Sequence, residues 1–227
     1  MLLEVKGIKK TYQTKARKTV AVNDVSFSLG KNDFVSVVGR SGSGKSTLLN
    51  MLTGLLAPTS GAILFEGADL RGMGDLAVSR VRNERMGYVP QGYSVLANLT
   101  LLDNVCLPFY LFKREGAVHE KARDLLGRMG IAQLADRYPA ELSGGEIRRA
   151  AIARALINDP AILIADEPTG DLDEQTTGEI MRLFKEINTG GTAILMVTHE
   201  PDTVAYGNRL FQMAQGKLEE TQIKELN

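Results

Sequence analysis

The stretch Phe34-Val-Ser-Val-Val-Gly39-Arg-Ser-Gly-Ser-Gly44-Lys45-Ser46-Thr47 decides the fold of this 227-residue chain. A short apolar run, typical of a buried strand, leads into a glycine-rich turn of the form G-x-x-x-x-G-K-[ST]. Such a turn curls so that its backbone N–H groups face phosphate oxygens, and the following helix adds the positive end of its dipole. We predict a phosphate-binding loop (P-loop) between a strand over 34–38 and a helix over 45–56.

Two side chains of this loop add chemistry to its backbone contacts. Lys45 would bridge the β- and γ-phosphates of a nucleotide, and Ser46 would offer its hydroxyl to Mg²⁺. A chance glycine turn is the alternative, but the strand before the turn and the helix after it are the context that the motif requires. The candidate nucleotide-binding residues of this segment are Gly39, Arg40, Ser41, Gly42, Ser43, Gly44, Lys45, Ser46 and Thr47.

A second apolar run, Ile162–Ala165, ends in two carboxylates, Asp166 and Glu167. At the carboxyl edge of a parallel sheet, Asp166 would reach the Mg²⁺ shell and Glu167 could orient an attacking water as a general base. An acidic turn after a strand is common, so this pattern gains its meaning from the P-loop. His199 follows the apolar run Ala193–Thr198 and could reach a γ-phosphate, although a surface or capping histidine is the commoner interpretation when it is taken alone.

The segment Leu142-Ser143-Gly144-Gly145-Glu146 precedes an expected helix over 147–157. Its serine and glycines could form a second helix start that binds phosphate. One active site has no need of two such elements. We therefore predict that this segment serves a nucleotide held by another subunit.

The order of these motifs resembles that of the ABC ATPase family over almost the whole chain. Besides the P-loop and the acidic strand, it includes a glutamine loop at Gln91, the family signature at Leu142–Glu146, a loop ending in Asp173 and a switch histidine at His199. The resemblance implies that Gln91 is a catalytic residue and a metal and water ligand, and that Asp173 contributes to the nucleotide site. It also implies that Tyr12 stacks on adenine, with a plain strand tyrosine as the alternative.

The resemblance further implies a head-to-tail dimer that binds ATP and Mg²⁺. Each ATP would lie between the P-loop of one copy and the signature of the other, where Ser143, Gly144 and Gly145 would contact it. Closure of the two copies, alignment of water by Glu167 and hydrolysis would follow in turn. The chain departs from the family pattern at three positions, none of which removes a catalytic group: Glu146, where glutamine is usual, Asp171 and Ala97.

A narrower resemblance concerns the partner. The segment Gln91–Val105 followed by Leu107-Pro108, and the long connection over 13–19, are similar to the subfamily of macrolide-exporter, lipoprotein-release, bacitracin-resistance and cell-division ATPases. This implies a separate transmembrane permease subunit that is driven for export, extraction or mechanotransmission. The stretch Tyr93–Phe112 would form the groove that receives a helix of that partner, with the chain in the cytoplasm on the inner face of the membrane.

The pattern along the chain predicts an α/β fold, because short β-rich runs alternate with helical segments. The alternation of Val25, Phe27 and Leu29 with polar residues indicates an antiparallel sheet with one exposed face. Strands are expected over 2–12, 20–29 and 209–213, and helices over 117–129 and 174–188. We expect one ABC ATPase domain over 1–227, with a RecA-like core and β subdomain over about 1–90 and 139–227 and an inserted helical lobe over about 91–138.

Composition narrows the classes of partner. Lys+Arg and Asp+Glu both number 27, so the formal net charge is zero, which argues against broad binding to nucleic acid or to an anionic membrane. The single cysteine cannot form an internal disulfide. Apolar runs reach only about eight residues, whereas a spanning helix needs about 20, so membrane contact is expected through the partner alone.

Two other functions compete with transport. A soluble ABC ATPase acting on DNA or ribosomes usually needs a long coiled-coil insert or two tandem cassettes, and neither pattern is seen here. A P-loop kinase acting on a small molecule would explain residues 39–46 but leave the signature and His199 without a role.

Overall fold

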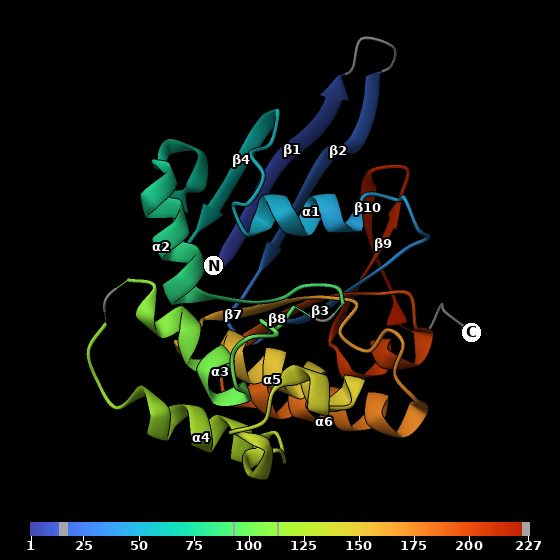
Figure 1. Ribbon diagram of the computed structural model, residues 1–227. Helices are drawn as coiled ribbons and strands as arrows, with labels where there is room; N and C mark the ends of the chain where they lie inside the picture. Colours follow the sequence, from blue (N-terminus) through green and yellow to red (C-terminus); the bar gives the residue numbers. More distant parts are fainter. Residues whose placement is uncertain (14–17, 93, 113, 224–227) are drawn as a thin grey trace.

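The computed structural model of the chain describes residues 1–13, 18–92, 94–112 and 114–223. Two sheets and their helices form successive layers, with α1 between the sheets and α3 to α6 on the far side of the second sheet (Figure 1). The strands are β1 (Leu3–Gln13), β2 (Lys18–Leu29), β3 (Phe34–Val38), β4 (Ser60–Phe65), β5 (Ala68–Asp69), β6 (Met86–Val89), β7 (Ile162–Asp166), β8 (Ala193–Thr198), β9 (Arg209–Ala214) and β10 (Lys217–Thr221). The α-helices are α1 (Lys45–Leu52), α2 (Asp75–Arg85), α3 (Leu101–Tyr110), α4 (Val118–Arg128), α5 (Gly144–Leu156) and α6 (Glu174–Thr189).

The second sheet has six strands in the order β10-β9-β3-β8-β7-β6. Its strands from β9 to β6 are parallel, and β10 pairs antiparallel with β9. Every residue of β3, β7 and β8 is buried, as expected for parallel strands covered on both faces. Because β3, β8 and β7 are neighbours, their carboxyl ends bring the P-loop, His199 and the Asp166-Glu167 pair to one edge of the sheet.

The first sheet is antiparallel, in the order β2-β1-β4-β5, which confirms the expected antiparallel subdomain. Val22, Val25 and Leu29 are buried, while Asp24 and Ser26, on either side of Val25, are exposed. The buried face packs with Leu48 of α1 against one face of the second sheet and forms a shared core.

A second core lies on the other face of the six-stranded sheet. Here Phe184 of α6 packs with Phe34 of β3, with ring centroids 6.4 Å apart, and Ile152 of α5 joins the same cluster. Helix α5 also packs against α3 and α4, so it joins the helical region to the sheet. Cys106 of α3 is buried in this core, and burial raises the pKa of its thiol to about 11.

The structure corrects the end of the first predicted helix. α1 ends at Leu52 rather than at residue 56, because Thr53 caps it and Gly54 turns the chain with φ +67°. A Cβ on Gly54 would lie 2.4 Å from Val78 of α2, so the turn depends on a close approach that the local sequence does not reveal. Helix α5 starts at Gly144, three residues earlier than predicted, and the helix expected over 174–188 is α6 with one more residue.

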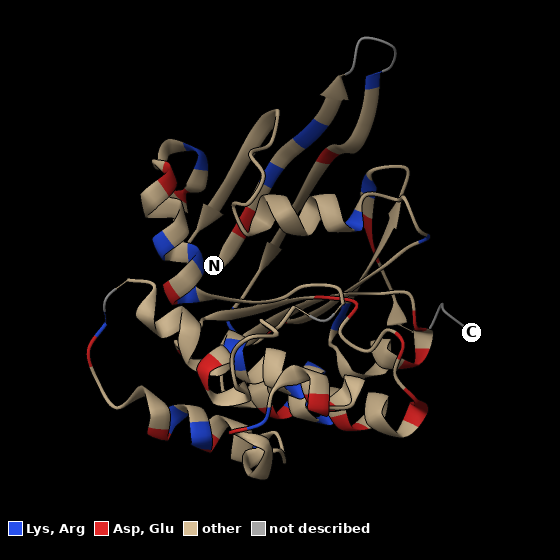
Figure 2. Cartoon of the chain, viewed as in Figure 1, with Lys and Arg blue, Asp and Glu red and all other residues tan. Residues whose placement is uncertain are grey.

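Three remaining expectations from the sequence concern the long connection, membrane-spanning helices and the distribution of charge. Residues 14–17 of the long connection and Tyr93 lie outside the described part of the chain. Among the described residues, no helix is both long and apolar enough to cross a membrane. Lys and Arg are interleaved with Asp and Glu on α2 and α4 (Figure 2), in keeping with the balanced net charge.

Candidate nucleotide site

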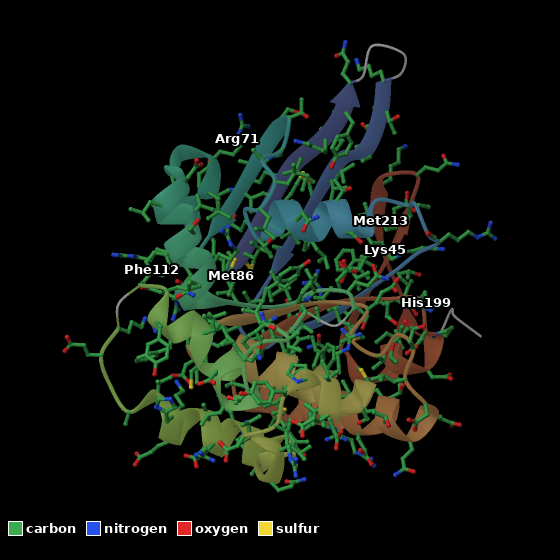
Figure 3. All side chains as sticks on the ribbon, viewed as in Figure 1. Lys45, Arg71, Met86, Phe112, His199 and Met213 are labelled. Carbon is green, nitrogen blue, oxygen red and sulfur yellow. The ribbon has the colours of Figure 1, made fainter. Side chains whose placement is uncertain are left out.

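The P-loop wraps the amino-terminal end of α1, and two of its glycines leave no room for a side chain. A Cβ on Gly39 would lie 2.3 Å from the carbonyl oxygen of Met213, and one on Gly44 would lie 2.3 Å from that of Ala21. Gly44 also has φ +111°, in the region that favours glycine. Figure 3 shows Lys45 beside Met213 at this end of α1. Lys45 Nζ donates to the carbonyl oxygens of the loop itself, at 2.6 Å for Gly39 and 3.2 Å for Arg40.

Asp166, at the end of β7, lies against the P-loop helix. Burial raises the pKa of its carboxyl, and a hydrogen bond from the Ser46 hydroxyl and the charge of Lys45 oppose that rise. A buried carboxylate beside a hydroxyl is a set of hard oxygen donors, which is the chemistry that Mg²⁺ prefers. The pair Ser46 and Asp166 therefore fits a magnesium ion carried by a nucleotide.

Glu167 is held between two of the other predicted catalytic residues. Gln91 Nε2 donates to Glu167 Oε2 at 2.9 Å, and His199 Nδ1 lies 3.3 Å from Glu167 Oε1. The backbone of Glu167 has φ +49°, and its N–H donates to the carbonyl oxygen of Val197 at 2.9 Å. A non-glycine residue held in this conformation is uncommon, and such strain concentrates at functional sites. Both carboxylate oxygens thus face polar partners at the end of the sheet.

Several of these residues line one open cavity of about 250 Å³, although Asp166 and His199 do not. The structure brings P-loop residues, Gln91 and Glu167 together around it. The predicted residues that line this cavity are Ser41, Gly42, Gly44, Lys45, Ser46, Thr47, Gln91 and Glu167.

Tyr12 and the signature do not line this cavity. Tyr12 lies on β1 with 42% of its surface exposed, and Lys10 Nζ lies 5.7 Å from its ring centroid. Ser143 is the N-cap of α5, and Asp173 is the N-cap of α6. A Cβ on Gly145 would lie 2.9 Å from Thr176 Cγ2 of α6. The two helix starts are therefore adjacent.

Asp173 and Glu146 each take part in capping one of these helix starts. Asp173 accepts hydrogen bonds from the hydroxyl and the N–H of Thr176, and these bonds lower the pKa of its carboxyl. Glu146 forms a capping box with Ser143: its carboxylate accepts from both the N–H and the hydroxyl of Ser143 at 2.8 Å. Glu146, which stands where glutamine is usual in the family signature, thus places a carboxylate beside the Ser143 hydroxyl, which is expected to face phosphate.

Sequence reasoning missed two sets of contacts around the site. The Thr169 hydroxyl donates to Glu200 at 2.6 Å, which ties the loop after β7 to the residue that follows His199. Arg148 of α5 donates to the backbone on both sides of Gln91. The spacing of these residues gives no signal, because each pair is at least 31 residues apart in the chain.

A groove lies away from this cavity, between α2, β6, α5 and the end of α3. It has a volume of about 520 Å³. Met86 and Phe112, which line it, lie together on the side of the molecule opposite His199 (Figure 3). Pro108, Leu111 and Phe112, from the stretch Tyr93–Phe112 predicted to form a docking groove, line it together with residues of α2, β6 and α5, and the docking role stays a prediction.

The fold and the P-loop define a nucleotide-binding domain of the ATP-binding cassette type. A family model described as ABC transporter matches residues 22–170, and the chain belongs to this family. It is 33% identical to the ATP-binding cassette MJ0796 in a dimeric post-hydrolysis state bound to ADP and Pi, with 98% of this chain and 99% of that one covered and a TM-score of 0.91. It is 29% identical to cbiO1 from Clostridium perfringens, part of the ABC transporter complex cbiONQ, with 99% and 90% covered and a TM-score of 0.86.

Proposed function

We propose that this chain is the subunit of an ABC transporter that binds and hydrolyses MgATP and drives a separate membrane subunit. The observation that carries the proposal is the position of Glu167, held by Gln91 and His199 at the cavity that contains Lys45 and Ser46. The purified chain should release free phosphate from MgATP. Transfer of the phosphate to a small acceptor instead would favour the kinase alternative.

The chain's residues divide the work of hydrolysis. The P-loop N–H groups and Lys45 bind the phosphates, while Ser46, Asp166 and Gln91 would hold Mg²⁺, whose positive charge would stabilise the transferred phosphate. Glu167 accepts a proton from water as general base, and His199 contacts the γ-phosphate. Tyr12 offers an exposed ring on which adenine stacks.

Two copies are proposed to assemble head to tail. The signature lies outside the cavity of its own chain, so its serine and glycines are available to a second copy. The solved cassette MJ0796 is dimeric. Ser143, Gly144 and Gly145 then bind the γ-phosphate of the partner's ATP, and Asp173 lies next to them at the start of α6.

The capping carboxylate of Glu146 is expected to weaken this dimer. Glu146→Gln removes the negative charge from the side chain that accepts the Ser143 hydroxyl proton. The Ser143 hydroxyl is then freer to donate to the γ-phosphate of the partner's ATP. Two like charges about 5 Å apart repel by roughly 1 kcal/mol in water and more when partly buried. We therefore expect the ATP concentration for half-maximal dimerisation to fall about fivefold or more, as measured by light scattering. An unchanged value would show that Glu146 does not face the nucleotide.

The groove behind the site is proposed to receive a helix of the transmembrane permease. Leu76 of α2 and Leu111 after α3 are 73% and 64% exposed, and both line it. Exposed apolar side chains beside a groove are typical of a protein interface. A Cβ on Gly87 would lie 2.6 Å from the carbonyl oxygen of Ala155, so the floor of the groove joins β6 directly to α5. Motion of α5 would therefore reach a bound partner.

Charges placed in the groove should detach the membrane partner and spare hydrolysis. Leu76→Glu with Leu111→Glu would bury two unpaired carboxylates at the interface, and loss of a few kcal/mol corresponds to about 10²-fold weaker binding. Co-purification from gently solubilised native membranes, followed by mass spectrometry, measures the association. Leu55→Glu, at an exposed leucine that does not line the groove, is the matched control. Equal recovery of the partner by the double variant would contradict the docking site.

The remaining assignments extend this proposal. The core over about 1–90 and 139–227 binds nucleotide and the lobe over about 91–138 transmits its state, with the chain held in the cytoplasm at the inner face of the membrane through the permease.

Export, extraction or mechanotransmission is favoured by the resemblance of residues 91–108 to the subfamily of macrolide-exporter, lipoprotein-release, bacitracin-resistance and cell-division ATPases. A cassette acting on DNA or ribosomes is the alternative, and salt-sensitive binding to either would support it.

A further inference from the structure

We propose that Arg148 is a positioning residue that holds Gln91 against Glu167 and so links the signature helix to the catalytic carboxylate of the same subunit. This inference rests on the proposed ATPase function. Arg148 lies on α5, and only 4% of it is exposed. Burial of a guanidinium costs free energy unless its N–H groups are hydrogen-bonded. The hydrogen bonds of Arg148 are therefore expected to hold it firmly against its partners.

Two of the partners of Arg148 are backbone carbonyls that flank a single residue. One guanidinium nitrogen donates to the carbonyl oxygen of Pro90 at 3.2 Å and to that of Gly92 at 3.1 Å. Gln91 stands between them, and its side chain donates to Glu167 at 2.9 Å. The backbone on each side of Gln91 is thus fixed from α5, which sets the direction of the amide toward the carboxylate.

The same helix carries the signature at its start. Ser143 is the N-cap of α5, and Arg148 follows five residues later within the continuous helix Gly144–Leu156. A second tether from α5 lies close by, where Arg154 donates to the carbonyl oxygen and the hydroxyl of Ser94 at 2.8 and 2.9 Å. A shift of α5, such as the one expected when the signature meets the partner's ATP, would therefore carry residues 90–92 and Ser94 with it.

Lysine cannot replace arginine in this role. The guanidinium presents several N–H groups in a rigid plane, whereas an ammonium is a point charge on a flexible stem. Arg148→Lys keeps the charge but loosens the hold on the two carbonyls. Since a misplacement of about 1 Å can cost about 10²-fold in rate, we expect kcat to fall about tenfold or more. The affinity for ATP, bound mainly by the P-loop, should change less than about twofold.

A double-mutant cycle with Gln91 separates positioning from general stability. If Arg148 acts through Gln91, Arg148→Lys should lower kcat in the wild-type background and have little further effect on Gln91→Ala. Arg149→Lys is the matched control, since Arg149 is the next residue on α5 but donates to Met129 and pairs with Glu179. An equal loss of kcat from Arg148→Lys in both backgrounds would overturn the inference.

Hydrogen exchange provides a readout that does not need hydrolysis. The side-chain N–H protons of Gln91, which donate to Glu167 at 2.9 Å, should exchange about tenfold faster in Arg148→Lys than in the wild type, as measured by NMR, while backbone amides of β7 and β8 should be unchanged. Unchanged exchange at the Gln91 side chain would overturn the inference even if the chain is an active ATPase. An inactive wild type with the expected exchange would instead overturn the ATPase proposal and leave the positioning role standing. Should Arg148→Lys fail to fold, Arg148→Gln takes its place, since it leaves no unpaired buried charge.

Discussion

Glu167→Gln is expected to lower the turnover of ATP by about 10²–10⁴-fold while leaving its binding intact. The amide keeps the size of the carboxylate and can still contact Gln91 and His199, but it cannot accept a proton from water. Nucleotide affinity should remain, because the P-loop and Lys45 are untouched. The variant should therefore accumulate as an ATP-bound dimer, which size-exclusion chromatography with MgATP would detect as a doubled mass without phosphate release.

The control for this variant is another glutamate of the same region of the fold. Glu186→Gln, an exposed position on α6, makes the same chemical change away from the cavity and should keep full turnover. Rapid turnover by Glu167→Gln would remove Glu167 from the role of base. A loss of both binding and turnover would indicate that the carboxylate shapes the cavity rather than acting on water.

The local patterns of the sequence predicted the elements whose geometry is set by neighbouring residues. The strand–turn–helix of the P-loop and the apolar strand that ends in Asp166 were both found, because their glycines, apolar runs and carboxylates are contiguous in the chain. The region between residues 57 and 90 was not predicted. Helix α2 has no buried residue, so it carries no apolar stripe to recognise, and β6 has only four residues.

Contacts between residues that are far apart in the chain are the part of the site that the sequence alone could not predict. Gln91 and Glu167 are 76 residues apart, and only the resemblance to the ABC family assigned both to one site. Arg148 had no such signal, because its partners are backbone carbonyls, which any residue supplies. The structure likewise shows that the Glu146 carboxylate accepts a hydrogen bond from the Ser143 hydroxyl. Because of this contact, the glutamate in the signature is expected to repel the partner's ATP.

Two inactive variants should restore each other when mixed, because each site is proposed to draw on two copies. Lys45→Ala removes the cation that binds the β- and γ-phosphates, and Ser143→Arg places a bulky side chain at the signature. Each alone should be nearly inactive. A heterodimer has one site with both defects and one with an intact P-loop and an intact signature.

Random mixing of equal amounts gives heterodimers in half of the pairs, each with one working site of two, so the mixture should reach about one quarter of the wild-type rate. Phosphate release from mixtures of varied ratio measures this, and the rate should peak at equal amounts. Mixing Lys45→Ala with itself at the same total concentration is the control. A mixture as inactive as its components would place the whole site within one chain, and full activity of Ser143→Arg alone would remove the signature from it.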